Sequence, residues 1–325
     1  MLIRIRRANL CRALRRVKDL GLCRVETVGT DRIGISATDG IRSFRGLVPA
    51  DVLGTGVLVV SAAIVLQVLD ALHVESVDIV RQSDYLKISD ICSLVLMPEA
   101  AVGVIPTCST HAIATPLEQV KLAMEQVAHA ATTDIVSPLC GIEWRDGAIV
   151  AGSSAAIALC KVAIPIDRAI AVPPGIAQHL PDAAAIAVDS DRIFWRDGES
   201  ETSLRLPPHR FPSRLVDHVL SELSRPHWTQ IGIHGHFLSE VREVGAAIEA
   251  TEAELAVEPG SMRARVSSAR GSAEIKIPVE SMLRGEVRIP IRHLVGPVDS
   301  IWLGGRGVFL TGASYTCYIS ALCTH

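Results

Sequence analysis

Three short stretches carry residue types that could do chemistry. His234 and His236 could form a metal pair, but no third ligand follows at a useful spacing, so a strand-to-helix turn is the better interpretation. Ser153 and Ser154 lack the glycine setting of a nucleophile elbow, and no motif ties a histidine or an acid to them. No GK[ST] follows Gly304-Gly305-Arg306-Gly307, which is therefore interpreted as a hairpin turn. The sequence thus predicts a protein that is not an enzyme, with no metal and no cofactor.

The densest group of positive charges lies near the N-terminus. The spacing predicts a helix from Asn9, as its cap, to about Asp19, with an inward side of Leu10, Ala13, Leu14 and Val17. The opposite side carries Arg12, Arg15, Arg16 and Lys18, and Arg24 follows in a predicted loop. The usual fate of such charges is a solvated helix face, and contact with phosphates is the alternative.

Composition limits the class of protein. A length of 325 residues allows two or three domains. Although 49% of the residues are hydrophobic, no run approaches the length of a membrane span, and the basic start lacks the features of a secretory signal. The eight cysteines contain no CxxC pair, which predicts reduced thiols in a cytoplasmic protein. The net charge of −3 argues against an overall basic protein but allows a local basic surface.

The stretch from Thr115 to Ala156 defines a structural unit. Thr115-Pro116-Leu117-Glu118 has the pattern of a capping box with proline at the first helical position. An amphipathic helix follows, and then two predicted strands, Leu139 to Trp144 and Ala148 to Gly152, around an Arg-Asp-Gly turn. The unit is therefore a helix followed by a β-hairpin.

This unit occurs three times along the chain. Corresponding strands begin near Val77, Ile186 and Ile301, which places the repeats about 110 residues apart. Predicted linkers lie at Pro98 to Pro106 and at Leu206 to Pro212. The prediction is an α+β fold of three domains, 1–105, 106–207 and 208–325, each with amphipathic helices packed on antiparallel sheet.

Several motifs resemble one family. They are Ser36 to Arg42, which contains an ATDG-R turn, Gly141 to Trp144 with Asp146-Gly147, Arg210-Phe211-Pro212, and Tyr318-Ile319. Their order and spacing, together with the threefold repeat, resemble the bacterial β sliding clamp, the processivity subunit of the replicative DNA polymerase. The resemblance extends from Met1 to His325.

The resemblance implies a homodimer in which two chains pair head to tail into a ring of six domains. The helices would line a central hole around double-stranded DNA, without sequence readout. It further implies a DNA polymerase and a clamp loader as partners, a cytoplasmic location and no membrane contact. The implied DNA contacts are Arg12, Arg15, Arg16, Arg24, Lys121 and Arg242. Lys121 and Arg242 are expected to attract DNA less strongly, because Lys121 lies near Glu125, and Arg242 lies between Glu240 and Glu243.

The resemblance also implies a groove for partner peptides between the second and third domains. Its expected lining is Leu139, Gly152, Ile157, Pro212, Tyr318, Ile319 and Leu322. The family's TDGHRL turn is replaced by the residues from Gly152 to Ile157, and its tail of methionine, proline, methionine and arginine by those from Ala321 to Thr324. These departures indicate a divergent clamp. Ile319→Asp is expected to abolish partner binding and leave the fold intact.

Two other functions remain open from the sequence. The altered groove motif motivates a clamp-like regulatory or decoy protein with weak or no loading on DNA. An enzyme built on the same scaffold is the third hypothesis, which the lack of a catalytic constellation disfavours.

Overall fold

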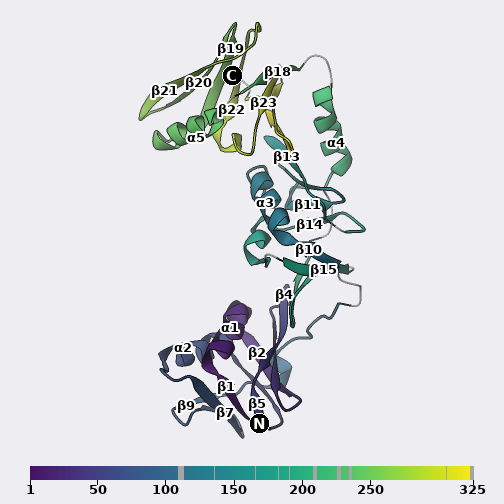
Figure 1. Cartoon of the computed structure of the whole chain (residues 1–325), viewed down its shortest axis with the longest axis vertical. Coiled ribbons are helices and arrows are strands. Elements are labelled where there is room, and N and C mark those ends of the chain that lie inside the picture. The colour runs from purple at the N-terminus through teal and green to yellow at the C-terminus, as the bar shows by residue number, and fades with distance from the viewer. Residues whose placement is uncertain are drawn as a thin grey trace. The chain divides into compact units, whose positions relative to one another are not determined.

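The computed structural model describes residues 1–108, 113–134, 136–164, 166–181, 183–189, 191–207, 211–224, 228–233, 236–304 and 306–322. The predictions for Arg210, His234, Gly235, Gly305, Cys323 and Thr324 fall outside these residues. The chain forms two compact units, whose elements are labelled in Figure 1. Unit 1 comprises Met1–Thr115 and Ala183–Leu206, and unit 2 comprises the described residues of Pro116–Asp182 and Pro207–His325.

Unit 1 is built on two sheets. The first has the order β5 (Asp51–Gly54), β1 (Leu2–Arg6), β7 (Ser76–Gln82), β8 (Tyr85–Ile88) and β9 (Cys92–Val95). The second has the order β10 (Ile113–Pro116), β15 (Ala183–Asp189), β16 (Arg192–Asp197), β17 (Ser200–Arg205), β4 (Arg42–Pro49), β3 (Arg32–Thr38), β2 (Leu22–Val28) and β6 (Val57–Ser61). The short 3-10 helices η1 (Lys18–Leu20) and η2 (Glu99–Ala101) complete the unit.

Helices α1 (Arg7–Val17) and α2 (Ala62–Ala71) pack against each other and against these sheets. Leu10 and Leu14 of α1 share one buried core with Ile3 of β1 and Ile35 of β3. The sequence predicts Ser61 as the cap of α2, and this is confirmed, because the Ser61 hydroxyl accepts a hydrogen bond from the Ile64 amide at 3.5 Å. Helix α1 buries the apolar side that its spacing predicts. On α2, Val65 and Leu69 are buried as their spacing predicts, but Ile64, which was expected on the same side, is 50% exposed.

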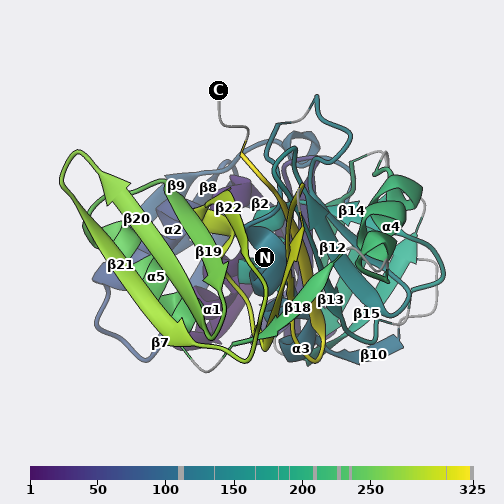
Figure 2. The same cartoon turned by 90° about the horizontal axis from the view of Figure 1, so that it is seen from above.

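Unit 2 also has two sheets. The larger has the order β14 (Ile170–Val172), β11 (Ile142–Arg145), β12 (Ala148–Gly152), β13 (Ala156–Lys161), β25 (Tyr315–Ser320), β24 (Gly307–Thr311), β23 (Ser300–Gly304) and β18 (Thr229–Gly232). The smaller has the order β21 (Gly271–Pro278), β20 (Ser261–Ser268), β19 (Glu252–Glu258) and β22 (Gly285–Pro290). Figure 2 shows β21 as an outer strand of the smaller sheet, with α5 (Phe237–Ala247) close to it.

The remaining helices of unit 2 are α3 (Leu117–Ala128), α4 (Ser213–Ser221) and the 3-10 helices η3 (Pro174–His179), η4 (Glu222–Ser224) and η5 (Ile291–His293). Helices α3 and α4 contact the larger sheet, whereas η5 packs against α5. Helix α3 packs on β12 and β13, while Val216 of α4 packs with Val150 of β12. Ile149, the fully buried residue before Val150 on β12, points to the other side of the sheet. The sheet is therefore covered on both faces.

The predicted α+β class is confirmed, and four local predictions need correction. Helix α1 begins at Arg7 rather than after Asn9, because β1 leads directly into it without a side-chain cap. Helix α3 begins at Leu117, so Pro116 precedes it. The strand predicted from Leu139 to Trp144 is β11, which begins at Ile142 and ends at Arg145. Helix α4 follows the predicted second linker, where no helix was predicted.

The sheets continue from one sequence repeat into the next. Strand β17 pairs with β4, and β13 pairs with β25, both antiparallel. The division of the chain into domains 1–105, 106–207 and 208–325 remains a prediction, since the two compact units follow different limits.

A buried polar chain links α3 to the last strand of unit 2. Arg292 Nε donates to His293 Nε2 at 3.2 Å, so the His293 proton lies on Nδ1, which is 3.2 Å from His129 Nδ1. His129 Nε2 then donates to the Tyr315 hydroxyl at 2.7 Å. Burial lowers the pKa of both histidines to about 4, with added repulsion from His293 at His129 and from Arg292 at His293. The chain of hydrogen bonds therefore requires two neutral imidazoles.

We expect this cluster to make the protein acid-labile. The histidine pKa is lower in the folded state than its unfolded value near 6.5, so the stabilisation is complete above pH 6.5 and is lost as the pH falls towards 4. Each histidine contributes up to about 1.4 kcal/mol per pH unit in that window. Urea unfolding measured from pH 7.5 to 4.5 should show this slope, and His129→Gln should reduce it. The exposed His73→Gln is the matched control, and an equal slope in the His129 variant would contradict the assignment.

Candidate nucleic-acid and partner interfaces

Helix α1 presents a basic surface opposite its buried side. Arg12, Arg15 and Arg16 are all exposed. Arg15 Nη2 lies 3.2 Å from Asp70 Oδ1 of α2, and Arg16 Nη2 lies 3.1 Å from Asp197 Oδ2 at the end of β16. Within the described residues, Arg12 has no carboxylate partner. These three guanidinium groups therefore project from one exposed helix face, two of them in exposed ion pairs.

The same surface includes a residue that the sequence reading missed. A hollow beside α1 is lined by Arg7, Ala8, Cys11, Arg12, Arg15, Arg16 and Asp70. Arg7 was assigned to the stretch before the helix, because the predicted helix began at Asn9. Its position four residues before Cys11 places both on one side of α1. The strand-to-helix junction at Arg6 was the signal that would have included it.

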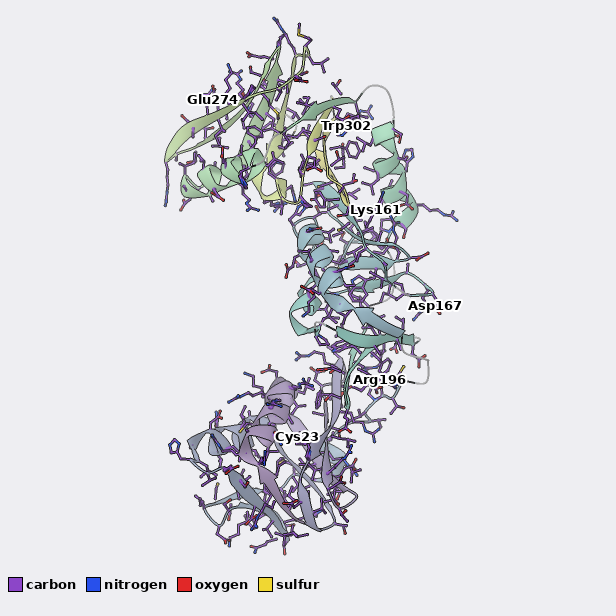
Figure 3. All side chains as sticks on the ribbon, viewed as in Figure 1. Cys23, Lys161, Asp167, Arg196, Glu274 and Trp302 are labelled. Carbon is purple, nitrogen blue, oxygen red and sulfur yellow. The ribbon has the colours of Figure 1, made fainter. Side chains whose placement is uncertain are left out.

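Arg24 does not join this surface. It lies on β2, between Cys23 and Val25, whose side chains are buried in the core that α1 covers. Because side chains alternate along a strand, Arg24 faces the opposite side of the sheet. There its guanidinium lies 3.2 Å from Glu26 Oε2 and 3.8 Å from Glu99 Oε2. Cys23 is labelled in Figure 3. The predicted four-arginine cluster is therefore corrected to the arginines of α1.

The helices of unit 2 are less basic, as the sequence predicted. Lys121 of α3 is half-buried, and Glu118 and Glu125 are exposed beside it. Arg242 of α5 is exposed, as are Glu240 and Glu243. Among the three described helices that carry predicted DNA contacts, only α1 has an excess of positive charge.

Part of the predicted partner groove comes together around α4. Leu139 and Ile157 pack in one apolar cluster with Val150, Leu159, Phe211, Val216, Val219 and Leu220. A Cβ at Gly152 would lie 3.1 Å from Leu139 Cδ2, which explains the glycine at this position. Pro212 directly precedes α4. Four of the seven predicted groove residues therefore surround the start of this helix.

Tyr318 and Ile319 lie on opposite faces of β25. Tyr318 is directly opposite Ile157 in the strand register and therefore shares its face. The same row continues through Phe309 to Trp302, which Figure 3 labels. Ile319, by contrast, is fully buried on the other face. Leu322 is half-buried, and its amide donates to the Arg288 carbonyl at 2.8 Å. The prediction that Ile319 lines the groove is therefore wrong.

Two polar contacts fix α4 on β11. The Ser213 hydroxyl at the first turn of α4 donates to Glu143 Oε1 at 2.5 Å, and Glu143 is fully buried. Arg145 Nη1 lies 2.8 Å from Asp217 Oδ1 and 3.8 Å from Glu143 Oε2. The helix is thus positioned over Leu139 and Ile157 by both polar and apolar contacts.

The turns that resemble family motifs have structural roles. Asp39 Oδ1 accepts hydrogen bonds from the amides of Ile41 and Arg42, at 2.9 and 2.6 Å. In the middle repeat, the Ser153 hydroxyl accepts from the amides of Ala155 and Ala156, at 3.4 and 3.3 Å. Ser153 thus takes over the turn-forming role of the missing aspartate.

The other chemical hypotheses find no support in the described parts of the chain. No group of three or more potential metal ligands occurs among the described residues. His236 is exposed at the start of α5, and its expected pair lies outside the described residues. None of the seven described cysteines forms a disulfide. None of the described helices is both long and apolar enough to cross a membrane.

The fold is that of the bacterial β sliding clamps. No protein-family model and no curated protein matches the sequence. Solved structures do match it over the full length of both chains. A candidate DNA polymerase III beta subunit from Eubacterium rectale has a TM-score of 0.87 at 14% identity. The pol III beta of Caulobacter crescentus and the DNA polymerase sliding clamp of Bacillus subtilis each have a TM-score of 0.83, at 16% and 17% identity. The resemblance predicted from the motifs is therefore confirmed at the level of the fold.

The burial of Ile319 corrects the expectation that Ile319→Asp would leave the fold intact. Ile319→Asp would place an unpaired carboxylate in the core, so we expect it to lower the free energy of unfolding by about 3 kcal/mol or more. Ser320→Asp, on the half-buried outer face of the same strand, is the matched control and should cost about 1 kcal/mol or less. Chemical denaturation of both variants measures the difference. Equal stability of the two variants would show that Ile319 is not a core residue.

Proposed function

We propose that this protein is a DNA sliding clamp that encircles duplex DNA and tethers a DNA polymerase as its processivity factor. The proposal is carried by the match of the whole fold, end to end, with solved clamps of several bacteria. The role is that of a non-catalytic accessory subunit in the cytoplasm. The domain limits 1–105, 106–207 and 208–325 belong to this proposal.

The basic surface of α1 supplies the DNA contacts in this proposal. Arg12, Arg15 and Arg16 project from one helix face, as contact with a phosphate backbone requires. Phosphate contacts carry no sequence information, so they suit a protein that must move along any sequence. Lys121 and Arg242 would contribute less, because exposed glutamates neighbour both residues.

A ring requires two chains, joined head to tail through sheet edges. In the described sheets, β9 is a terminal strand of unit 1 and β21 a terminal strand of unit 2. Val95 of β9 and its cross-strand neighbour Tyr85 are exposed apolar residues. On β21, Ala273, Ile275 and Ile277 remain half-buried. Pairing of β9 with β21 of a second copy would cover both edges, which are otherwise prone to uncontrolled association.

The partner site in this proposal is the surface around α4. The half-buried Leu139, Pro212 and Tyr318, with Ile157 beneath α4, would line the seat for an apolar anchor of a polymerase or clamp loader peptide. Its altered turn, built by Ser153 in place of an aspartate, suits a partner peptide different from that of the typical clamp.

The ring is tested by mass and by topology. Light scattering should give a homodimer near twice the chain mass of 34.8 kDa. After prolonged incubation, the dimer should remain on nicked circular DNA through gel filtration at high salt and leave once the circle is linearised. Retention only on the circle shows topological linkage. A monomer at every concentration, equally absent from both DNA forms, would instead support the regulatory or decoy protein.

The DNA contacts are tested by the salt dependence of binding. Arg12→Ala with Arg16→Ala should weaken binding to short duplexes of any sequence. It should also reduce the slope of log affinity against log salt by about 0.9 for each lost phosphate contact. Arg24→Ala is the matched control, because this arginine faces the other side of its sheet, and it should leave the slope unchanged. If the double variant keeps both its affinity and its slope, α1 does not contact DNA.

A further inference from the structure

Two arginines of the α1 surface are occupied by carboxylates from other parts of the fold. Asp70 comes from the last turn of α2, and Asp197 from the end of β16. Both are far from α1 in sequence, so neither pair is a consequence of helical spacing. They lie 3.2 and 3.1 Å from Arg15 and Arg16, respectively. Tertiary structure therefore brings one acid to each of these arginines.

The geometry leaves the pairs weak and open to exchange. The four side chains are between 44% and 62% exposed, and each pair has one short contact between nitrogen and oxygen. Ion pairs exposed to this degree contribute little to stability, because water and salt screen them. A guanidinium has five N–H donors, so a phosphate oxygen can take the place of a carboxylate oxygen with little rearrangement. Arg12, on the same helix face as Arg15 and Arg16, is available to a phosphate without such an exchange.

We propose that Asp70 and Asp197 attenuate DNA binding by competing with phosphates for Arg15 and Arg16. This inference rests on the proposed function. In a ring that topology keeps on DNA, tight phosphate contacts are unnecessary and would slow movement along the duplex. A resident carboxylate weakens each phosphate contact, because the guanidinium must give up its ion pair to form that contact. With the two aspartates in place, the arginine face still attracts DNA but binds it weakly.

On α3, the exposed Glu118 and Glu125 lie one helical turn from Lys121. On α1 itself no acidic side chain occupies the first turn, and the competing acids come from α2 and β16 instead.

Charge-neutral, isosteric variants test the inference. Asp70→Asn and Asp197→Asn should each bind short duplex DNA roughly two- to five-fold more tightly than the parent at low salt, the equivalent of one exposed ion pair. Asp84→Asn is the control, because it removes the same charge in the turn between β7 and β8, where Asp84 has no arginine partner among the described residues. The gain in DNA affinity of Asp70→Asn and of Asp197→Asn must exceed that of Asp84→Asn, because the control reports the general effect of net charge.

A double-mutant cycle separates competition from a general field. In an Arg16→Ala background, Asp197→Asn should have no greater effect than Asp84→Asn, because the competed group is gone. An undiminished effect in that background, or single variants no tighter than the control, would overturn the proposal. The cycle uses short linear duplexes, whereas the clamp function is tested on circles. A failed cycle with intact retention on circles would therefore refute attenuation alone, and the reverse result would refute the clamp function alone.

Discussion

Backbone pairing between repeats is the interaction on which the rest of this structure depends. Strand β4 of the first repeat pairs with β17 of the second, and β13 of the second pairs with β25 of the third. Each ladder turns two small sheets into one of eight strands, so no repeat ends in a free edge at these seams. At the first seam Arg192 adds side-chain contacts, since it donates to the carbonyls of Gly40 and Ile41 at 2.8 and 3.2 Å. The position of the basic helix and of the partner surface follows from this continuity.

Much of the fold could be read from the sequence because its signals are local. Alternation and turn residues defined β12 to the residue, and helical spacing identified the buried side of α1. Helix α4 was missed because it is short and follows a stretch interpreted as a linker. Its signals were Pro212 before its first turn and apolar residues at Val216, Val219 and Leu220.

The sites were harder to predict, because they depend on which face a residue occupies and on partners distant in sequence. Strict alternation along β25 would have placed Tyr318 and Ile319 on opposite faces, and the same rule along β2 would have separated Arg24 from α1. The pairing of Arg15 with Asp70 and of Arg16 with Asp197 has no local signal at all. The same is true of Glu143, whose burial beside Ser213 depends on α4 lying against β11.

The β4–β17 and β13–β25 ladders also determine where the chain can be divided into fragments. The two compact units divide the middle repeat, since β15, β16 and β17 belong with the first repeat and α3 with β11 to β14 belongs with the third. A fragment ending at the first predicted linker would keep β4 but lose β17, and its new edge would bear the exposed backbone groups of a long strand. Expressed alone, such a fragment would be aggregation-prone, although its hydrophobic core would be complete. The sequence repeats and the compact units of this protein are therefore different segments of the chain.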